Sequence, residues 1–541
     1  MDYAYSRQGL EGREKKLERL FEIVPGAASW TLLGGMCLLS FFRPLTASVL
    51  FIAFYLYWVL RVLYMTIFLT LSYMRLWVER ETDWMERIRE IDGGYLPGPR
   101  APGLRALISR RIHEKKMREA QGSAPPRSPD IHHLVIIPVA NETKKTLEPG
   151  VAAIASSRFP PVRMIVVLSV EERSGDGILR DVNALKESYG HRFAGFMVVV
   201  HPDKVPGEAA VKGANCSFGA KQAQRYLTER GIDPEKVIVS CFDADTVVGP
   251  DYFSCLTYHF LVTPRRLRSG FQPIPVYHNN FWDVPGFSRI LDVGASFFQL
   301  VEATNPEQLV SFSSHSISFS SLAEAGYWPV DMISDDSAIF WKSLIRFDGD
   351  YRVVPIYTTV SMDVTTGESF AGAFGNVYKQ KRRWAWGIEN FPIVMRAFIR
   401  DRSIPLARKS RDAFRLFEGF LSWATWSFIL TFVGWLPLLC AGRSINDSLF
   451  FYSAPRIKFV IFSLSFTGLA ACIAISFLLL PREKEGISLR RKLLHIAEWL
   501  TVPLVSIFLG AVPALEAQTR LMTGRYLEFF VTPKFTGREK K

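Results

Sequence analysis

Cysteine is scarce in this sequence, and its scarcity excludes two kinds of architecture. The 541 residues include six cysteines, and none of them forms a C-x-x-C pair. A zinc site built on cysteine pairs and a disulfide framework are therefore excluded, and the pattern fits a reducing cytoplasm. The sequence also lacks internal repeats. We expect no cleaved signal, because some 25 mostly polar residues precede the first apolar run and no small-residue cleavage site follows it.

Long apolar runs near both ends predict an integral membrane protein. Two of them are nearly unbroken and reach the roughly 20 residues that cross a bilayer as a helix. A third run, Trp426–Cys440, is shorter and becomes long enough when it is extended toward the N-terminus to about residue 417. A fourth, residues 27–42, predicts the first arm of a hairpin that turns at Arg43-Pro44. In chain order these runs are residues 27–42, 47–73, 417–440 and 459–480.

The net charge of +13 has a simple explanation in the membrane runs. In a soluble protein such an excess would suggest binding to nucleic acid. Here the basic residues cluster beside the apolar runs, in "GREKKLERL", "MRLWVER" and "PREKEGISLRRK". The positive-inside rule assigns these flanks to the cytoplasm. We therefore expect residues 74–416 inside, the loop 442–458 outside, and no nucleic-acid partner.

A separate domain is predicted to begin after the Pro/Gly/Ser-rich stretch "EAQGSAPPRSPD". Short apolar runs then alternate with helical patterns, notably a helix over residues 213–231. The runs do not alternate with polar residues, so we expect strands that are buried on both faces of a doubly wound, mostly parallel α/β sheet. Ligands of such sheets bind at the carboxyl ends of the strands. The predicted strands are "HHLVIIPVA", "VRMIVVLSV", "GFMVVVH" and "KVIVSCFDAD".

Asp243 and Asp245 follow the last of these strands with one residue between them. Side chains at i and i+2 of an extended chain point the same way, and two like charges so close favour a cation between them. A hard divalent cation held by one or two carboxylates and by substrate phosphates would fit. The alternative is a solvated turn at the strand end, which D-x-D alone does not exclude.

Two further groups of residues carry chemistry. Asp335 and Asp336 precede a helical pattern, so they form either a helix-capping pair or a site with one aspartate as a general base. In "YKQKRRWAWGIEN", Gln380, Arg383 and Trp384 share one helix face, which suits either phosphate and sugar binding or a basic membrane-surface helix. We favour the binding interpretation, because a membrane-surface helix does not require a glutamine there.

In this order the patterns resemble the family-2 inverting glycosyltransferases, and more closely the membrane-embedded branch that includes cellulose, chitin and hyaluronan synthases. "VIIPVANET" is similar to the family's V-P-x-Y-N-E strand, and "VKGANCS" is similar to its K-x-x-A-L-N stretch. The resemblance covers residues 133–390 and the flanking spans. It implies a GT-A-like cytoplasmic domain inserted between N- and C-terminal transmembrane helices. It also implies inverting transfer from a nucleotide-diphosphate sugar, for which we expect UDP.

The resemblance implies a role for each of these residues. Asp245 and Asp243 would hold Mg2+ or Mn2+ and the diphosphate, and Asp336 would deprotonate the acceptor hydroxyl. The other implied roles are nucleotide-sugar binding by Glu142, Glu171, Lys212, Asp243, Gln380 and Arg383, and acceptor binding by Trp384 and Asp335. For Lys212 the alternative is an ordinary exposed lysine in a glycine-containing loop.

The sequence departs from the family pattern in three places. "VVLSVEERSGDG" has Glu171 and Glu172 where the family has Asp-Asp-Gly-Ser, which leaves the nucleobase open. The T-E-D triplet is Ser334-Asp335-Asp336 here. The clear spans number about four, fewer than a synthase that threads its own polymer usually has.

The expected division of the chain has seven parts. The region after residue 481 could hold one more span, a hairpin broken at Pro503 and Pro513, or an interfacial helix, and a cytoplasmic basic tail favours the last two. The parts are a cytoplasmic N-terminal segment (1–25), a transmembrane hairpin (26–76), a charged linker (77–130), the transferase domain (131–397), an interfacial helix (398–416), two transmembrane helices (417–480), and a C-terminal region (481–541) with a membrane segment at 493–515 and a basic tail.

The expected function is sugar transfer to a growing polysaccharide at the bacterial inner or plasma membrane. One alternative is a non-processive enzyme that adds a single sugar to a lipid. Another is a non-catalytic membrane scaffold with a transferase-like domain. Expected partners are the nucleotide-sugar donor, a polysaccharide or lipid acceptor and membrane lipid, with a second copy of the chain or an export partner as further candidates.

Overall fold

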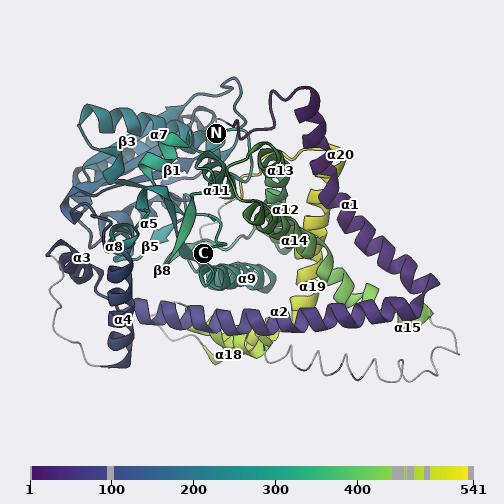
Figure 1. Ribbon diagram of the computed structural model, residues 1–541. Helices are drawn as coiled ribbons and strands as arrows, with labels where there is room; N and C mark the ends of the chain where they lie inside the picture. Colours follow the sequence, from purple (N-terminus) through teal and green to yellow (C-terminus); the bar gives the residue numbers. More distant parts are fainter. Residues whose placement is uncertain are drawn as a thin grey trace.

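A computed structural model describes residues 3–93, 103–440, 456, 459, 463, 468–480 and 488–533. It comprises one α/β domain and a set of long helices that pack beside it (Figure 1). The predicted outer loop at 442–458 lies outside the described residues except for position 456. The first part of the predicted span 459–480 is likewise almost wholly outside them.

The sheet of the α/β domain is mixed and mostly parallel, as the sequence predicts. Its eight strands are ordered β3-β2-β1-β4-β7-β6-β8-β5. The first four form a continuous parallel block, β7 runs antiparallel to β4 and β6, β8 is parallel to β6, and β5 is antiparallel to β8. The strands are β1 (His132–Val139), β2 (Met164–Glu171), β3 (Gly195–His201), β4 (Val237–Cys241), β5 (Val247–Val248), β6 (Ser269–Tyr277), β7 (Ser316–Ser318) and β8 (Arg352–Met362).

Burial on both faces explains the unbroken apolar strands. Along β1, Leu134 and Ile136 pack on one side with α7 (Lys212–Glu229) and α11 (Asp335–Arg346). Val135 and Ile137 pack on the other side with α5 (Lys144–Ala155), α6 (Gly175–Tyr189) and α8 (Tyr252–Val262). β2 and β4 are buried throughout, but β3 is only partly buried. The expectation of double burial is wrong for β3, because it pairs with β2 alone and forms one edge of the sheet.

One glycine allows α7 to start close to α11. A Cβ at Gly213 would lie 2.3 Å from the carbonyl oxygen of Pro329 and 2.9 Å from the Cβ of Asp335. Any larger residue would therefore push the first turn of α7 away from the loop that leads into α11. Gly213 thus brings Lys212, the first residue of α7, next to the aspartates at the start of α11.

Among the described residues, three helices are long and apolar enough to cross a membrane, or four if one bent pair counts as a single span. α1 (Gly12–Phe42) and α2 (Pro44–Glu79) form the predicted hairpin with its turn at Arg43. α14 (Leu406–Thr431) is followed after a 44° bend by residues 433–440, and the third long helix is Leu489–Thr523. A shorter apolar helix covers Gly468–Leu479.

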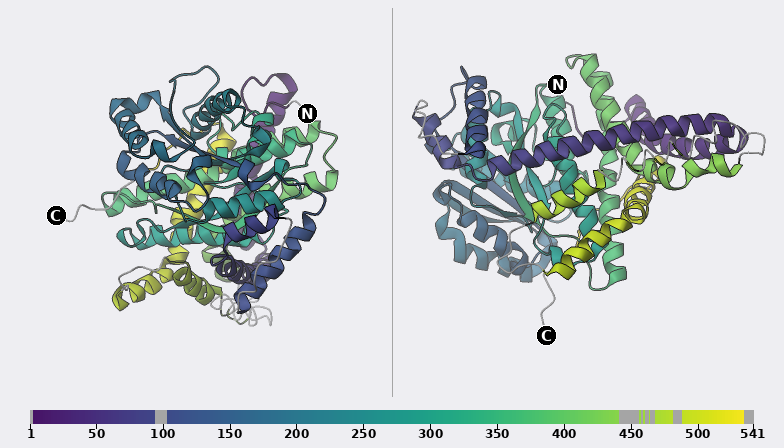
Figure 2. Two further views of the ribbon diagram at one scale, coloured as in Figure 1. Left: turned by 90° about the vertical axis from the view of Figure 1, so that its left-hand side faces the viewer. Right: turned by 90° about the horizontal axis from the view of Figure 1, so that it is seen from below.

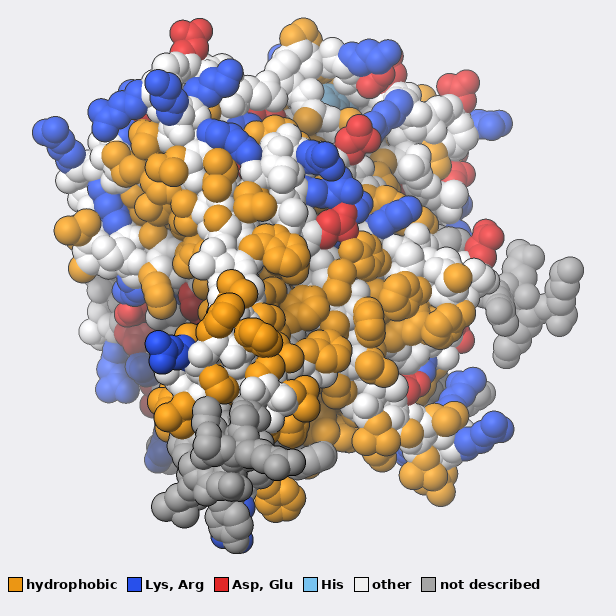
Figure 3. Space-filling model, turned by 90° about the vertical axis from the view of Figure 1, so that its right-hand side faces the viewer, with side chains coloured by type: hydrophobic (Ala, Val, Ile, Leu, Met, Phe, Trp, Pro, Cys, Tyr) orange, Lys and Arg blue, Asp and Glu red, His pale blue; other side chains and the backbone are white. Residues whose placement is uncertain are grey.

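The surface beside α1 supports association with a membrane. Figure 3 shows a broad field of hydrophobic side chains on this side of the molecule, with Lys and Arg gathered along one border. Exposed side chains near the α1–α2 turn include Leu38, Phe41, Phe42, Leu45 and Val49. Apolar surface on this scale, carried by helices of this length, indicates a membrane-associated protein.

Two of the expected segments have a different structure. The charged linker contains α3 (Trp84–Asp92) and α4 (Leu104–Glu119), and Trp84 packs against Tyr258 of α8. The expected interfacial helix at 398–416 is divided, because α13 (Asn390–Arg400) ends where Asp401 accepts a hydrogen bond from the Ile404 amide at 2.8 Å. The chain from Leu406 onward then belongs to α14.

The segment Leu489–Thr523 is a continuous helix that contacts the α/β domain at both ends. The segment is a single helix of 35 residues that runs through both Pro503 and Pro513 without turning back, so the hairpin alternative is wrong. Glu498 pairs with Arg289, and Glu516 accepts hydrogen bonds from Tyr378 at 2.7 Å and Arg382 at 2.6 Å. The helix, coloured yellow-green to yellow in Figures 1 and 2, therefore lies alongside the domain.

Candidate active site

A cavity of about 1060 Å3 opens at the carboxyl ends of the parallel strands and continues between α2, α14 and the helix Leu489–Thr523. Nine of the ten residues to which the sequence analysis assigns a role line this one cavity. They are Glu142, Glu171, Lys212, Asp243, Asp245, Asp336, Gln380, Arg383 and Trp384. The structure therefore brings together side chains from β1, β2, α7, the β4 end, α11 and α12 (Phe370–Ala385). Asp335 is the exception.

Asp243 and Asp245 lie in a tight turn rather than on an extended strand. β4 ends at Cys241, and the amide of Thr246 donates to the carbonyl of Asp243 at 2.9 Å. The assumption of extended chain behind their predicted alignment is therefore wrong, although both carboxylates reach the same cavity. Asp245 is 4% exposed and accepts a hydrogen bond from the amide of Asp363 at 2.9 Å.

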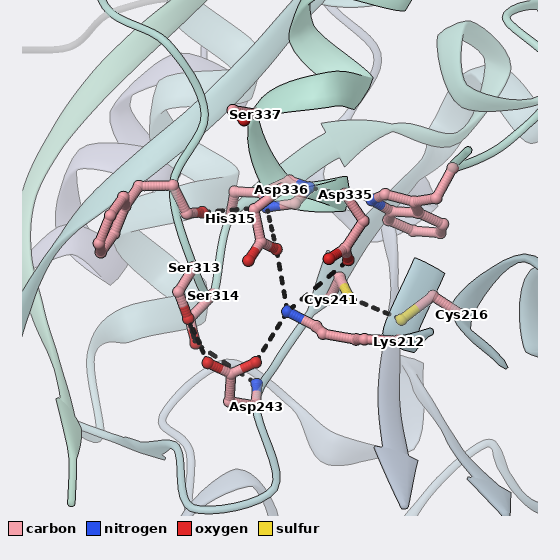
Figure 4. A network of polar contacts seen from close by, with 12 residues as sticks. Lys212, Cys216, Cys241, Asp243, Ser313, Ser314, His315, Asp335, Asp336 and Ser337 are labelled. Carbon is pink, nitrogen blue, oxygen red and sulfur yellow. Dashed lines mark hydrogen bonds and ion pairs between the residues drawn. The ribbon is translucent and has the colours of Figure 1, made fainter. Parts of the chain in front are cut away.

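Lys212 is the cation beside these acids in the structure. Its Nζ lies 2.7 Å from Oδ1 of Asp243, 2.9 Å from Oδ1 of Asp336 and 4.0 Å from Oδ2 of Asp335 (Figure 4). Burial lowers the pKa of Lys212, but the charges of these three carboxylates outweigh it and raise the pKa well above its ordinary value. The alternative of an exposed lysine is wrong, and Asp243 and Asp336 are held near each other by one ammonium group.

Asp335 and Asp336 occupy the first turn of α11, and their surroundings differ. Ser334 is the residue before the helix, and no side-chain capping bond forms there, so the capping interpretation is wrong. Asp336 lines the cavity, whereas Asp335 is 2% exposed and does not. Burial, followed by the neighbouring Asp336 carboxylate, raises the pKa of Asp335. The expected contact between Asp335 and an acceptor has no support in this geometry.

α12 presents Gln380, Arg383 and Trp384 to the cavity from one face. The Trp384 ring is held by the Lys381 ammonium at 3.6 Å from the ring centroid and by the edge of Phe312 at 5.8 Å between centroids. Lys381 in turn forms a buried ion pair with Asp292 at 2.6 Å. α12 packs against α9 (Gly286–Ala303) and α20 (Val512–Thr523), so it is not a free helix on a membrane surface.

Glu142 and Glu171 mark the opposite end of the site, at the carboxyl ends of β1 and β2. Glu142 Oε2 accepts hydrogen bonds from the amides of Ala140 at 2.7 Å and Asn141 at 3.0 Å. Glu171 pairs with Arg173. Both glutamates line the cavity.

Several cavity residues are not singled out by the sequence patterns. Asp363 follows β8 much as Asp243 follows β4, so an aspartate after an apolar strand was the available signal. Ser313 donates to Asp243, and its buried neighbour Ser314, which does not line the cavity, has a positive φ of 60°; no sequence pattern marks either residue. Phe529, Val531 and Thr532 of the C-terminal segment also line the cavity, where Arg383 lies 5.1 Å from the ring centroid of Phe529.

The residues present fit a hard divalent cation that is completed by substrate oxygens. Among the described residues, no group of three or more His, Cys, Asp or Glu is placed to hold a metal ion. Two aspartates are nevertheless at hand in one cavity, and Mg2+ or Mn2+ in such sites takes one or two carboxylates together with phosphate oxygens. The donor set therefore suits a metal that arrives with a diphosphate.

Residues 238–480 match the model of the family described as Glycosyl transferase family group 2. The match includes Asp243, Asp245, Asp336 and the Q-x-x-R-W stretch. It begins after Glu142 and Lys212, so these two residues lie outside it. No curated protein matches the chain.

Two solved structures illustrate remote similarity in shape. A mannosyltransferase from Pyrobaculum calidifontis, in complex with GDP-Man and Mn2+, is 15% identical over 78% of this chain and 95% of that chain, with a TM-score of 0.41. S. aureus TarS in complex with UDP-GlcNAc is 14% identical over 73% of this chain and 93% of that chain, with a TM-score of 0.35.

The raised pKa of Asp335 predicts a pH-dependent stability difference. As pH rises above about 4, the unfolded chain loses this proton before the folded chain does, so the free energy of unfolding falls. Asp335→Asn has no such proton to lose. The difference between its free energy of unfolding and that of the wild type should therefore shift in favour of the variant by roughly 1 kcal/mol per pH unit, until the pH reaches the raised pKa of Asp335.

Unfolding of the purified protein in detergent, followed at several pH values, measures the difference. The exposed Asp203→Asn serves as the matched control and should follow the wild-type curve. Parallel curves for Asp335→Asn and the wild type would contradict the assigned protonation of Asp335.

Proposed function

We propose that this protein is a membrane glycosyltransferase that transfers a sugar from a nucleotide-diphosphate sugar, with UDP as the nucleotide, to a growing polysaccharide with inversion. One observation carries the proposal. A single cavity holds the acid pair Asp243 and Asp245, the separate acid Asp336 and the three Q-x-x-R-W side chains, and it continues between the membrane helices. The match of residues 238–480 to glycosyl transferase family group 2 supports the same chemistry.

The donor would bind across the carboxyl ends of the strands. Glu142 and Glu171 would contact the nucleoside at one end, and Gln380 and Arg383 would hold the diphosphate at the other. Asp243 and Asp245 would hold the divalent cation, which supplies positive charge to the departing diphosphate. Arg383 stabilises the same charge through its fork of N–H donors.

Asp336 would act as the general base. It lies in the first turn of α11 and lines the same cavity as the acid pair and Trp384. It would take the proton of the acceptor hydroxyl as that oxygen attacks the anomeric carbon from the face opposite the diphosphate.

The membrane part of the cavity favours a carbohydrate chain as the acceptor. Its α2 wall includes Tyr55, Trp58 and Leu69, a stretch of roughly 21 Å at 1.5 Å per residue. Arg61 within this helix pairs with Glu418 at 2.5 Å, and ionisable side chains in a membrane helix usually face a polar path. Flat indole rings suit the C–H faces of sugars, and the cavity is lined by Trp58, Trp341, Trp384, Trp423, Trp426 and Trp499.

The α/β domain would lie on the cytoplasmic side, where nucleotide sugars are found and where the basic flanks of the spans belong. The helix Leu489–Thr523 would lie along the membrane surface, because it contacts the domain at both ends. Residues 529–532 return to the cavity, which keeps the C-terminal segment on the side of the active site.

The role of Asp336 is tested by Asp336→Asn. The asparagine keeps the shape but cannot accept a proton, so we expect donor binding within about threefold of wild type and a transfer rate lower by roughly 10^2- to 10^4-fold. Equilibrium binding of a labelled donor and a transfer assay on the same preparation measure both. Turnover at the wild-type rate in the pure variant would dismiss Asp336 as the base.

The metal role is tested by chelation and by Asp245→Ala. Excess EDTA should abolish transfer by the wild type, and added Mg2+ or Mn2+ should restore it, because the diphosphate leaves poorly without charge compensation. Asp245→Ala should stay inactive at the same metal concentrations. Undiminished transfer in excess EDTA would contradict the metal site.

Product length separates a polysaccharide from a lipid acceptor. Wild-type protein incubated with labelled donor should give products of many lengths on a gel, and Trp58→Ala, which removes an indole from the membrane part of the cavity, should shorten them. A single product that carries one sugar on a lipid would instead support the non-processive alternative. No product from any of a panel of donors, with all six acid and Q-x-x-R-W residues intact, would support the scaffold alternative.

A further inference from the structure

We propose that Glu389 is a positioning residue that fixes the general base relative to the Q-x-x-R-W helix. The inference rests on the proposed role of Asp336. Glu389 does not line the cavity, and it has no counterpart among the residues that the sequence patterns single out. It lies behind the cavity wall, 3% exposed, at the end of the short helix η8 (Trp386–Glu389) that follows α12 directly.

The carboxylate of Glu389 accepts four hydrogen bonds of good length. Oε1 accepts from the amide of Ile333, the amide of Ser334 and the hydroxyl of Ser334, each at 2.9 Å. Oε2 accepts from the indole N–H of Trp386 at 2.8 Å, and the Arg7 guanidinium lies 3.6 Å away. Burial raises the pKa of Glu389, but each of these neighbours is a donor and stabilises the ionised carboxylate.

These bonds connect the two halves of the proposed site. Ile333 and Ser334 are the residues immediately before Asp335 and Asp336, so Oε1 determines where α11 begins. Oε2 and the backbone of Glu389 belong to the turn that continues α12 beyond Trp384. Through one side chain, the start of the base-bearing helix is tied to the helix that carries Gln380, Arg383 and Trp384.

Neighbouring contacts reinforce the same joint. Asn390 donates to the hydroxyl of Ser334 at 3.0 Å and to that of Ser337 at 3.2 Å. The hydroxyl of Tyr5 donates to Asn390 at 2.6 Å, so the N-terminal segment supports the joint from outside. The Ser334 hydroxyl is thereby fixed as donor to Glu389 and acceptor from Asn390.

Stability alone is a poor reason for a carboxylate in this place. Burying a charged group is unfavourable, and well-packed apolar side chains often replace buried charges at no loss of stability. Placement of a catalytic group, by contrast, must be accurate, since an error of about 1 Å can cost 10^2-fold in rate. A rigid acceptor of four hydrogen bonds provides that accuracy at Asp336.

The test is Glu389→Gln in the full-length protein. Glutamine can keep its oxygen on Ile333 and Ser334 only by turning its amide N–H2 toward the N–H of Trp386 and toward Arg7, so the joint must shift. We expect the rate of transfer at saturating donor to fall roughly 10- to 100-fold, with donor affinity within about twofold of wild type. Wild-type transfer, or a loss of donor affinity that matches the loss of rate, would overturn the inference.

Asp401→Asn is the matched control. Asp401 is a carboxylate of similar burial, 5% exposed, that accepts from the Ile404 amide at 2.8 Å and the Ser403 hydroxyl at 2.9 Å at the far end of α13. It does not line the cavity. A similar loss of transfer in Asp401→Asn would mean that any buried carboxylate here has the same effect, and would count against a specific role for Glu389.

A double-variant cycle separates this inference from the proposed function. If Glu389 acts through Asp336, adding Glu389→Gln to Asp336→Asn should cause no further loss in a sensitive radiolabel assay. Full independent losses would overturn the inference while leaving Asp336 as the base. Wild-type turnover in Asp336→Asn alone would overturn the proposed function instead.

A milder variant covers the case in which Glu389→Gln does not fold. Ser334→Ala removes one of the three donors to Oε1 and leaves both amides in place. We expect a smaller loss of the same kind, roughly 3- to 10-fold in transfer rate with donor affinity retained. Unchanged transfer in Ser334→Ala, with Glu389→Gln unfolded, would count against the inference.

Discussion

The rest of the site depends on one ammonium group among three carboxylates. Lys212 lies within 3 Å of Asp243 and Asp336, with Asp335 just beyond. Without this cation the three acids could not lie so close together at neutral pH, because like charges in a partly buried site repel strongly. Burial of Asp335 favours its protonated form, and protonation removes one of the three negative charges and with it part of the repulsion.

The fold is arranged so that these groups meet. β4 delivers Asp243, the first turn of α7 delivers Lys212 at a point that only Gly213 permits, and α11 delivers Asp336. The cavity then extends from this charged centre into a membrane part lined by indole rings. In the proposed function, the donor would bind at the charged centre together with a divalent cation, and the acceptor would occupy the part lined by indole rings.

Local sequence patterns predicted the central strands of the sheet and most of the side chains that line the cavity. They did not predict which of these side chains contact one another. β1, β2 and β4 follow from apolar runs, and Gln380, Arg383 and Trp384 share a face because of helical spacing. The contact of Lys212 with Asp336 joins residues 124 positions apart, and nothing local indicates it. The role of Glu389 could not be predicted for the same reason, since the backbone partners of its Oε1, Ile333 and Ser334, lie more than fifty positions earlier. For Asp335 the sequence predicted too much, since it assigned acceptor binding to this residue. Adjacent residues on a helix point in different directions, and Asp335 is buried and does not line the cavity.

The most direct measurement is an electron-microscopy structure of the full-length protein in a lipid bilayer, with a non-hydrolysable UDP-sugar and Mn2+. We predict diphosphate density between Arg383 and the pair Asp243 and Asp245, the sugar facing Asp336, and the helix Leu489–Thr523 along the membrane surface. Nucleotide density elsewhere on the molecule, or carboxyl groups of Asp243 and Asp336 that open onto separate clefts, would contradict the account.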